Sequence, residues 1–183
     1  MEYKMTIAGV ERALPICPIN ENLQIGAFVM FGDTELTENC AKELIKIAPE
    51  HDVMITAESK GIPLVCAMAR QMGVNRYVLV RKSAKLYMRN IIKYDVQSIT
   101  TKAKQTLYLD GYDAEYLKGK RVLIVDDVIS TGASLQALEQ IVNAAGGNIV
   151  GKMAVLAEGE AADRKDILFL EKLPLFDKNG QPL

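Results

Sequence analysis

Val122-Leu123-Ile124-Val125-Asp126-Asp127-Val128-Ile129-Ser130-Thr131-Gly132-Ala133-Ser134 begins as an apolar run, passes through two adjacent carboxylates and ends in small polar residues. Branched apolar residues in an unbroken run are typical of a strand buried on both faces of a parallel sheet. Apolar residues continue at helical spacing from Leu135 to Ala145 and stop at Gly146-Gly147. We therefore predict a buried strand, an acid pair at a loop outside the core, and a helix that begins near Ala133.

The loop between this strand and helix has the chemistry of a phosphate site. Ligands of open parallel sheets bind beyond the carboxyl ends of the strands, where loop amides and the positive end of a helix attract anions. Ser130-Thr131 and Ser134 add hydroxyl donors, and Gly132 lets the backbone approach closely. The acid pair Asp126-Asp127 would repel phosphate, but it could accept hydrogen bonds from a diol or hold a hydrated magnesium ion. The pattern fits a ribose 5-phosphate; the alternative is a capped helix preceded by solvated acids.

Apolar runs alternate with amphipathic segments along the rest of the chain, which indicates an α/β fold with a mainly parallel twisted sheet flanked by helices. Apolar residues at helical spacing predict a helix over 36–47, with Asp33 or Thr34 as its cap, and a second helix over 62–72. Short apolar runs predict strands at 53–57, 77–80, 149–156 and 167–170. Between Ser83 and Gly119 no clean helix is expected. Tyr94–Thr101 and Gln105–Asp110 instead predict a long hairpin joined around 102–104, either a lid or an ordinary surface hairpin.

Length and composition favour one globular domain, with 183 residues, 49% hydrophobic and 25% charged. A net charge of −1 argues against a nucleic-acid interface built on a broad basic face. The three cysteines, Cys17, Cys40 and Cys66, fit no zinc or redox spacing and indicate reduced thiols in a cytoplasmic protein. The first residues lack the apolar stretch of a signal peptide, and no run is long and apolar enough to predict a membrane span.

The motif at 122–134 resembles the phosphoribosyl pyrophosphate (PRPP) site of type I phosphoribosyltransferases. Thr56-Ala57-Glu58-Ser59-Lys60-Gly61 is similar to the pyrophosphate loop of that family, which reads Glu-Ser-Arg-Gly in adenine enzymes. Arg81-Lys82-Ser83-Ala84-Lys85-Leu86 resembles the segment before their mobile catalytic loop, and Ser98–Leu109 is closer to the lid of xanthine enzymes. These segments occur in the order of the family.

The resemblance implies a site for each part of the reaction. Catalytic roles fall on Asp126, Asp127 and Lys85, and the acid pair would hold Mg²⁺ through water. PRPP and its phosphates would contact Ser59, Lys60, Gly61, Arg81, Lys82, Ser130, Thr131, Gly132, Ala133 and Ser134. The base would contact Val128, Ile129 and two amides, Asn20 and Asn22, although those amides also fit a simple polar turn. The single domain 1–183 would divide into a hood (about 1–32 with 158–183), a PRPP-binding core (about 33–157) and a lid (about 83–110).

The implied function is transfer of ribose 5-phosphate from PRPP to a purine, in purine salvage, by a homodimer that binds neither nucleic acid nor membrane. Adenine is slightly favoured, and xanthine and hypoxanthine are close rivals. Hypoxanthine-guanine enzymes usually carry an aspartate where this chain has Ser130, and the Glu-Tyr pair of adenine-enzyme lids is not found. The alternatives are an orotate or other pyrimidine enzyme and a non-catalytic PRPP sensor.

Overall fold

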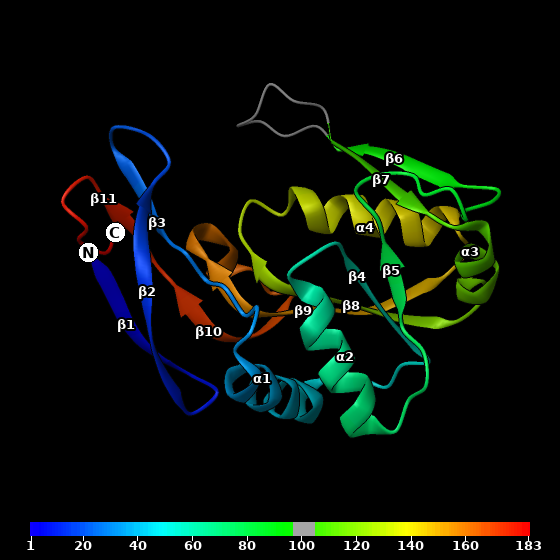
Figure 1. Cartoon of the computed structure of the whole chain (residues 1–183), viewed down its shortest axis with the longest axis horizontal. Helices are drawn as coiled ribbons and strands as arrows, with labels where there is room; N and C mark the ends of the chain where they lie inside the picture. The colour runs from blue at the N-terminus through cyan, green and yellow to red at the C-terminus, as the bar shows by residue number, and fades with distance from the viewer. Residues whose placement is uncertain (97–104) are drawn as a thin grey trace.

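A five-stranded parallel sheet in the order β10–β9–β8–β4–β5 forms the centre of the computed structural model, which describes residues 1–96 and 105–183 (Figure 1). The strands are β4 (Val53–Ala57), β5 (Val78–Val80), β8 (Arg121–Ile129), β9 (Asn148–Glu158) and β10 (Leu168–Leu173). Every neighbouring pair is parallel. The α/β fold with a mainly parallel sheet is confirmed, and the carboxyl ends of its strands share one edge.

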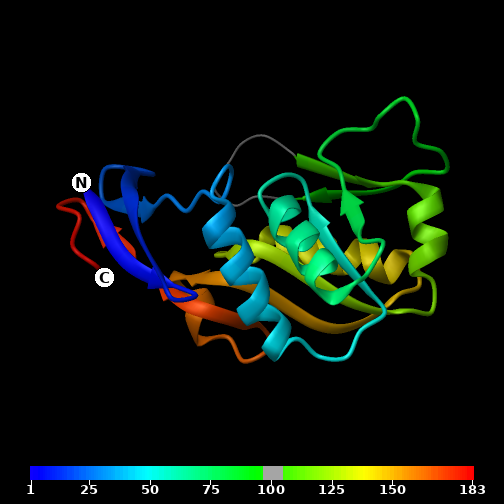
Figure 2. The ribbon, with the colours of Figure 1, turned by 60° about the horizontal axis from the view of Figure 1, so that its bottom comes forward.

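Helices cover both faces of this sheet (Figures 1 and 2). On one face lie α1 (Thr34–Ile47) and α2 (Gly61–Met72), which pack on each other as well as on the strands. On the other lie α4 (Ala133–Ala144), the short α3 (Gly111–Leu117) and the hairpin of β6 (Ile92–Val96) and β7 (Gln105–Leu109). The apolar stripe expected on α4 is buried as predicted: Leu135, Leu138, Ile141, Val142 and Ala145.

The segment between Ser83 and Gly119 contains a helix, so the expectation that it has none is wrong. Asp110 accepts a hydrogen bond from the amide of Tyr112 and caps α3. The helix is too short to show an apolar period in the sequence, because it has only seven residues. The hairpin is confirmed by antiparallel pairing of β6 with β7, although its expected turn at 102–104 lies outside the described residues. Leu107 and Leu109 are buried, so the base of the hairpin belongs to the core.

The acid pair lies within a strand rather than in a loop, which corrects a second expectation. Strand β8 continues past Val125 to Ile129, because β9 extends equally far and pairs with it up to Ile129 and Ala157. Asp127 is consequently only 5% exposed. A carboxylate at this depth affects stability as well as ligand binding.

Both ends of the chain meet in a second sheet at the carboxyl edge of the first (Figure 1). We call this sheet the hood; its strands are β1 (Glu2–Ile7), β2 (Val10–Pro18), β3 (Leu23–Gly26) and β11 (Leu175–Asp177). Phe176 is fully buried within it and packs edge-on against Tyr3, with ring centroids 5.0 Å apart. A single-turn helix, η1 (Gly159–Asp163), lies between β9 and β10.

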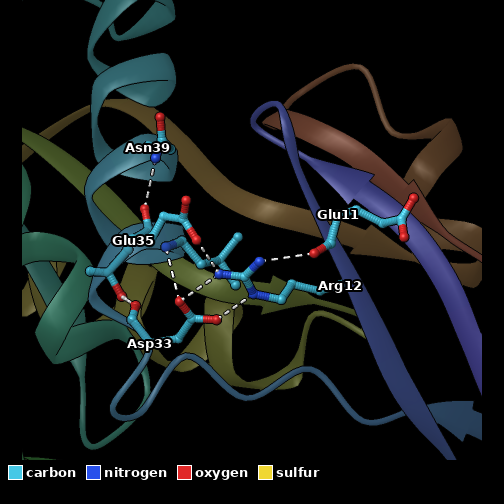
Figure 3. Close-up of polar contacts among 7 residues, drawn as sticks. Glu11, Arg12, Asp33, Glu35 and Asn39 are labelled. Atoms are coloured by element: carbon cyan, nitrogen blue, oxygen red, sulfur yellow. Dashed lines mark hydrogen bonds and ion pairs between the residues drawn. The ribbon is translucent and has the colours of Figure 1, made fainter.

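An arginine connects the hood to the start of α1 (Figure 3). The Arg12 guanidinium on β2 donates from Nε to Asp33 Oδ2 at 2.6 Å and from Nη2 to Glu35 Oε2 at 2.8 Å. Asp33 also caps α1, as expected, by accepting a hydrogen bond from the amide of Leu36 at 3.0 Å. The hydrogen bond from Arg12 holds the pKa of Asp33 below its ordinary value. The same carboxylate thus orients the hood and begins the helix.

Candidate active site

Three segments that are distant in sequence meet around one cavity at the carboxyl edge of the parallel sheet. They are the loop from β4 to α2, the acid pair near the end of β8, and the first turn of α4. The cavity has a volume of about 170 Å³. Its lining residues are Ala57, Glu58, Ser59, Lys60, Lys82, Leu107, Asp126, Asp127, Val128 and Ser134. Most of the lining is polar or charged, which suits a small ionic ligand better than an apolar one.

A lysine neutralises part of the charge of the acid pair. Lys60 Nζ lies 2.7 Å from Asp127 Oδ2 and donates to the carbonyl oxygen of Phe28 at 3.4 Å. Asp126 Oδ1 accepts a hydrogen bond from the amide of Asp127 at 2.9 Å. Burial and the neighbouring Asp127 carboxylate raise the pKa of Asp126. Lys60, which the sequence assigned to pyrophosphate, thus lies at the cavity with its ammonium group against Asp127.

The start of α4 has no side-chain cap and lies at the cavity edge. Its N-cap, Gly132, has a φ of 81° and no side chain to satisfy the first N–H groups of the helix. Ser134 lines the cavity in the first turn. Ser130 does not line the cavity, and its hydroxyl lies near the carboxylate of Glu158, whose pKa it acts to lower. A helix start of this kind is a ready anion site.

Tight packing below the β4–α2 loop explains its glycine. A Cβ on Gly61 would lie 2.1 Å from Thr56 Oγ1, a contact that no side chain could make. Gly61 therefore lets α2 begin directly against the buried strand β4 and beside the acid pair.

The predicted cations lie at different distances from the cavity. Lys82 lines it, while Arg81 is fixed behind it by backbone hydrogen bonds to Tyr108 and an Nη2–Oε1 contact of 3.4 Å to Glu58. Lys85 does not line the cavity, and its Nζ donates to Ser83 Oγ at 2.7 Å. Glu58, which we had not singled out, also accepts from the amide of Lys82 at 2.9 Å and so joins the two loops.

The residues expected to contact the base are only partly brought together. Val128 lines the cavity, whereas the side chain of Ile129 is 3% exposed and belongs to the core. Asn20 and Asn22 are exposed in the β2–β3 turn and do not line the cavity. Asn20 Oδ1 accepts from the amides of Asn22 and Leu23, both at 2.9 Å, so this asparagine closes the turn. The polar-turn interpretation therefore describes Asn20 better than a role in base recognition.

Two charged residues near the site were missed by the sequence interpretation. Glu158 ends β9 and is 8% exposed. Arg164 approaches Gly132 so closely that a Cβ on Gly132 would lie 2.7 Å from Arg164 Nη1. A signal existed for Glu158, because it follows a buried apolar strand in the same way as the acid pair. Nothing in the local pattern indicated Arg164, which approaches Gly132 only through the fold.

The acid pair could supply one or two of the ligands of a magnesium ion, with waters and substrate phosphates as the others. Within residues 1–96 and 105–183, no group of three or more His, Cys, Asp or Glu residues could enclose a metal. Mg²⁺ commonly uses one or two carboxylates, several waters and phosphates of the substrate. Asp126 and Asp127 are oxygen donors of that kind beside an anion site. In the described part of the chain, no helix is long and apolar enough to cross a membrane.

Comparison with known proteins gives one consistent result. Residues 31–181 match the family model described as "Phosphoribosyl transferase domain". A protein from Methanococcus maripaludis named hypoxanthine/guanine phosphoribosyltransferase is 33% identical over 158 residues, which are 82% of this chain and 81% of that protein. Adenine phosphoribosyltransferase from Thermoanaerobacter pseudethanolicus has a similar structure, with a TM-score of 0.71, 22% identity and coverage of 87% of this chain and 95% of that one. Adenine phosphoribosyltransferase from Rhodothermus marinus is also similar, with a TM-score of 0.69, 23% identity and coverage of 87% of this chain and 94% of that one.

Proposed function

Because the chain belongs to the phosphoribosyltransferase family, we propose that it transfers ribose 5-phosphate from PRPP to a purine and releases pyrophosphate. The observation that carries the proposal is the single cavity in which the acid pair, the β4–α2 loop and the start of α4 meet. These segments offer carboxylates, loop amides and a lysine within one small volume, and PRPP needs all three. The product is a purine nucleoside monophosphate.

The proposed base is a 6-oxopurine. Sequence relatives at about the 33% level are named hypoxanthine/guanine enzymes, whereas the named adenine enzymes share only 22% or 23% of residues and support the fold alone. This proposal moves away from the slight preference for adenine that went with the pyrophosphate loop and the segment at 81–86. It also places the pyrimidine alternative behind the purine one.

The proposed binding mode assigns each segment one part of PRPP. The 5-phosphate binds the amides at the start of α4 together with the hydroxyls of Thr131 and Ser134. The ribose hydroxyls donate to Asp126 and Asp127. The pyrophosphate binds along Ser59–Gly61 and Lys82, where Mg²⁺ would supply further positive charge between the phosphates and the acid pair.

The proposed chemistry needs no side-chain nucleophile. A nitrogen of the base attacks the anomeric carbon as pyrophosphate leaves, and positive charge develops on the ribose ring. Asp126 and Asp127 are fixed anions near that ring, and they stabilise the developing charge more than they stabilise the ground state. Positioning of the two substrates and exclusion of water complete the catalysis, since water would otherwise accept the ribose.

A panel of bases tests the proposal. The protein would be incubated with PRPP, Mg²⁺ and guanine, hypoxanthine, xanthine, adenine or orotate, and pyrophosphate release would be measured. We expect turnover with a 6-oxopurine and a loss of at least about 100-fold in kcat for Asp127→Asn, as for the loss of a preorganised charge. Because Asp127 is buried in β8, the melting temperature of the variant must be measured in parallel. Release with orotate alone, or with no base, would contradict the proposal.

A further inference from the structure

A buried carboxylate at the carboxyl edge of the parallel sheet has no part in the PRPP scheme described above. Glu158 is the last residue of β9 and is 8% exposed. Burial raises the pKa of Glu158 above its ordinary value, and the nearby Ser130 hydroxyl and Lys60 ammonium group oppose part of that rise.

Glu158 lies between the PRPP site and the hood. In the parallel register Ile129 of β8 pairs with Ala157, so Ser130 and Glu158 follow side by side at the carboxyl edge. On the other side Glu158 pairs with Leu173 of β10, two residues before hood strand β11 begins. Gly159 packs so closely on the hood that a Cβ there would lie 3.0 Å from Leu175 Cδ1. Glu158 thus lies between the strand that carries the acid pair, where we propose that ribose binds, and the hood, so we expect the base to bind toward this junction.

An ionised carboxylate is a selective partner for a purine, because its two oxygens only accept hydrogen bonds. A buried carboxylate also gains from each donor that it receives, because burial has removed it from water. A 6-oxopurine presents an N1–H donor, and guanine adds a 2-amino group next to it. Adenine presents an acceptor at N1, which a carboxylate repels.

We propose that Glu158 is a specificity-determining residue of the base site, accepting a hydrogen bond from N1–H of a 6-oxopurine and, with guanine, a second from the 2-amino group. The inference rests on the proposed function and deepens it. It predicts that the wild-type protein prefers guanine to hypoxanthine and both to adenine.

The test is Glu158→Gln, which keeps the size of the side chain but replaces one acceptor by a donor. Values of kcat/KM would be measured for guanine, hypoxanthine and adenine at saturating PRPP. We expect guanine to lose at least about 30-fold and hypoxanthine roughly 3- to 10-fold, because the amide retains one acceptor for N1–H but opposes the 2-amino group. Adenine should gain relative to both, and the KM for PRPP should stay within about twofold.

Two controls separate specificity from structure. Glu160→Gln makes the same change at an exposed position two residues later and should leave all three bases unchanged. Binding of GMP and IMP by calorimetry, which needs no turnover, should show that Glu158→Gln weakens GMP more than IMP. An equal loss with every base, or a change confined to PRPP, would overturn the role of Glu158. If the wild-type protein uses no purine at all, the proposed function itself fails, and the calorimetry with nucleotides then decides on Glu158 independently.

Discussion

Single side chains in this protein often carry two duties, and Asp33 is the clearest case. It caps α1 through the amide of Leu36 and binds Arg12 of the hood through both carboxylate oxygens. Lys60 is comparable, since it compensates Asp127 in the free protein and lines the cavity where pyrophosphate is proposed to bind. Such residues couple local structure to the site, so their substitution changes more than one property.

Replacing Arg12 by Met should reduce stability at neutral pH and reduce it less in acid. The pKa of Asp33 is lowered by Arg12, so the stabilisation is present above the ordinary value of 3.8 and is lost as pH falls through the lowered native pKa. Urea unfolding of wild type and Arg12→Met should therefore differ at pH 7 and converge well below pH 4.

A matched control for this pair exists on the surface of α1. Lys46 pairs with Glu43 with side chains 56% and 37% exposed, compared with 29% and 26% for Arg12 and Asp33. Lys46→Met should change stability little, because exposed ion pairs contribute little. A difference between wild type and Arg12→Met that is constant from pH 7 to pH 3 would mean that Asp33 does not provide the stabilisation.

At the level of elements, the hairpin β6–β7 packs on the core, whereas the segment that precedes it in the chain is exposed. Ile92 packs against the core and Leu107 and Leu109 are buried within it, whereas Leu86 and Tyr87 are largely exposed in the preceding segment. The sequence predicted that the stretch from Ser83 to Lys104 would be mobile without ligand, and residues 97–104 of it lie outside the described part of the chain. Within the described part, the buried residues of the hairpin place the expected movement in 83–91, since buried strands open least.

Amide exchange should resolve these parts. In the free protein we expect fast exchange across 83–91 and slow exchange across 106–109. PRPP with Mg²⁺ should slow the first segment through attraction to Lys82 and Lys85, and leave the second and Val122–Val125 unchanged. Equal protection of 83–91 with and without ligand would identify the segment as a fixed structural loop. It would then not close over the site to exclude water.

Lys85→Ala should lower kcat/KM by roughly 10-fold or more and change the melting temperature little. Its Nζ donates to Ser83 Oγ in an exposed contact, so its removal should cost little stability, while a charge-assisted contact to pyrophosphate would contribute about 1.5–3 kcal/mol. Lys178→Ala, at an exposed position in the hood, is the control and should keep full activity. Unchanged kcat/KM for Lys85→Ala would exclude Lys85 from the reaction.

The sequence predicted those elements whose stabilising contacts are local or periodic. The stripe of α4, the run of β4 and the cap at Asp33 were readable because each repeats a simple spacing or uses one side chain. The position of the acid pair was wrong because the length of β8 is set by its partner β9, which lies some 25 residues later in the chain. Glu158 could have been found, because it ends a buried apolar strand, whereas Arg164 approaches Gly132 only through the fold and no local pattern encodes that contact.

At the scale of the whole molecule, the hood is built from both ends of the chain and closes one edge of the parallel sheet (Figures 1 and 2). Strand β11 pairs with β3, about 150 residues apart, and Arg12 fixes the same sheet to α1. A base bound at the sheet edge would therefore touch residues that are distant in sequence. Substitutions in the hood should change KM for the base more than KM for PRPP.

The remaining prediction concerns assembly, because the segment between the hood and α1 exposes apolar side chains. Val29 and Phe31 are 55% and 52% exposed, next to a mainly apolar groove of about 260 Å³ between α1 and α2. The residues that line this groove are Met30, Gly32, Asp33, Thr34, Thr37, Glu38, Pro63, Cys66, Ala67 and Arg70. Burial of such a surface by a second copy would remove it from water, so we expect a homodimer of twice 20.2 kDa at micromolar concentration.

Phe31→Asp should convert this dimer into a 20.2 kDa monomer in sedimentation velocity. Burying one phenylalanine contributes about 1.5–3 kcal/mol, and a twofold interface buries two, so the dissociation constant should rise by roughly 100-fold or more. The monomer should melt close to the wild-type temperature at low concentration, because Phe31 is half exposed and supports little of the core. Ile19→Asp supplies the control, since Ile19 is 53% exposed in the hood turn, away from the groove, and its replacement should leave the dimer intact. A wild-type protein that sediments only at 20.2 kDa, or a Phe31→Asp variant that remains dimeric, would show that this surface is not the contact between copies.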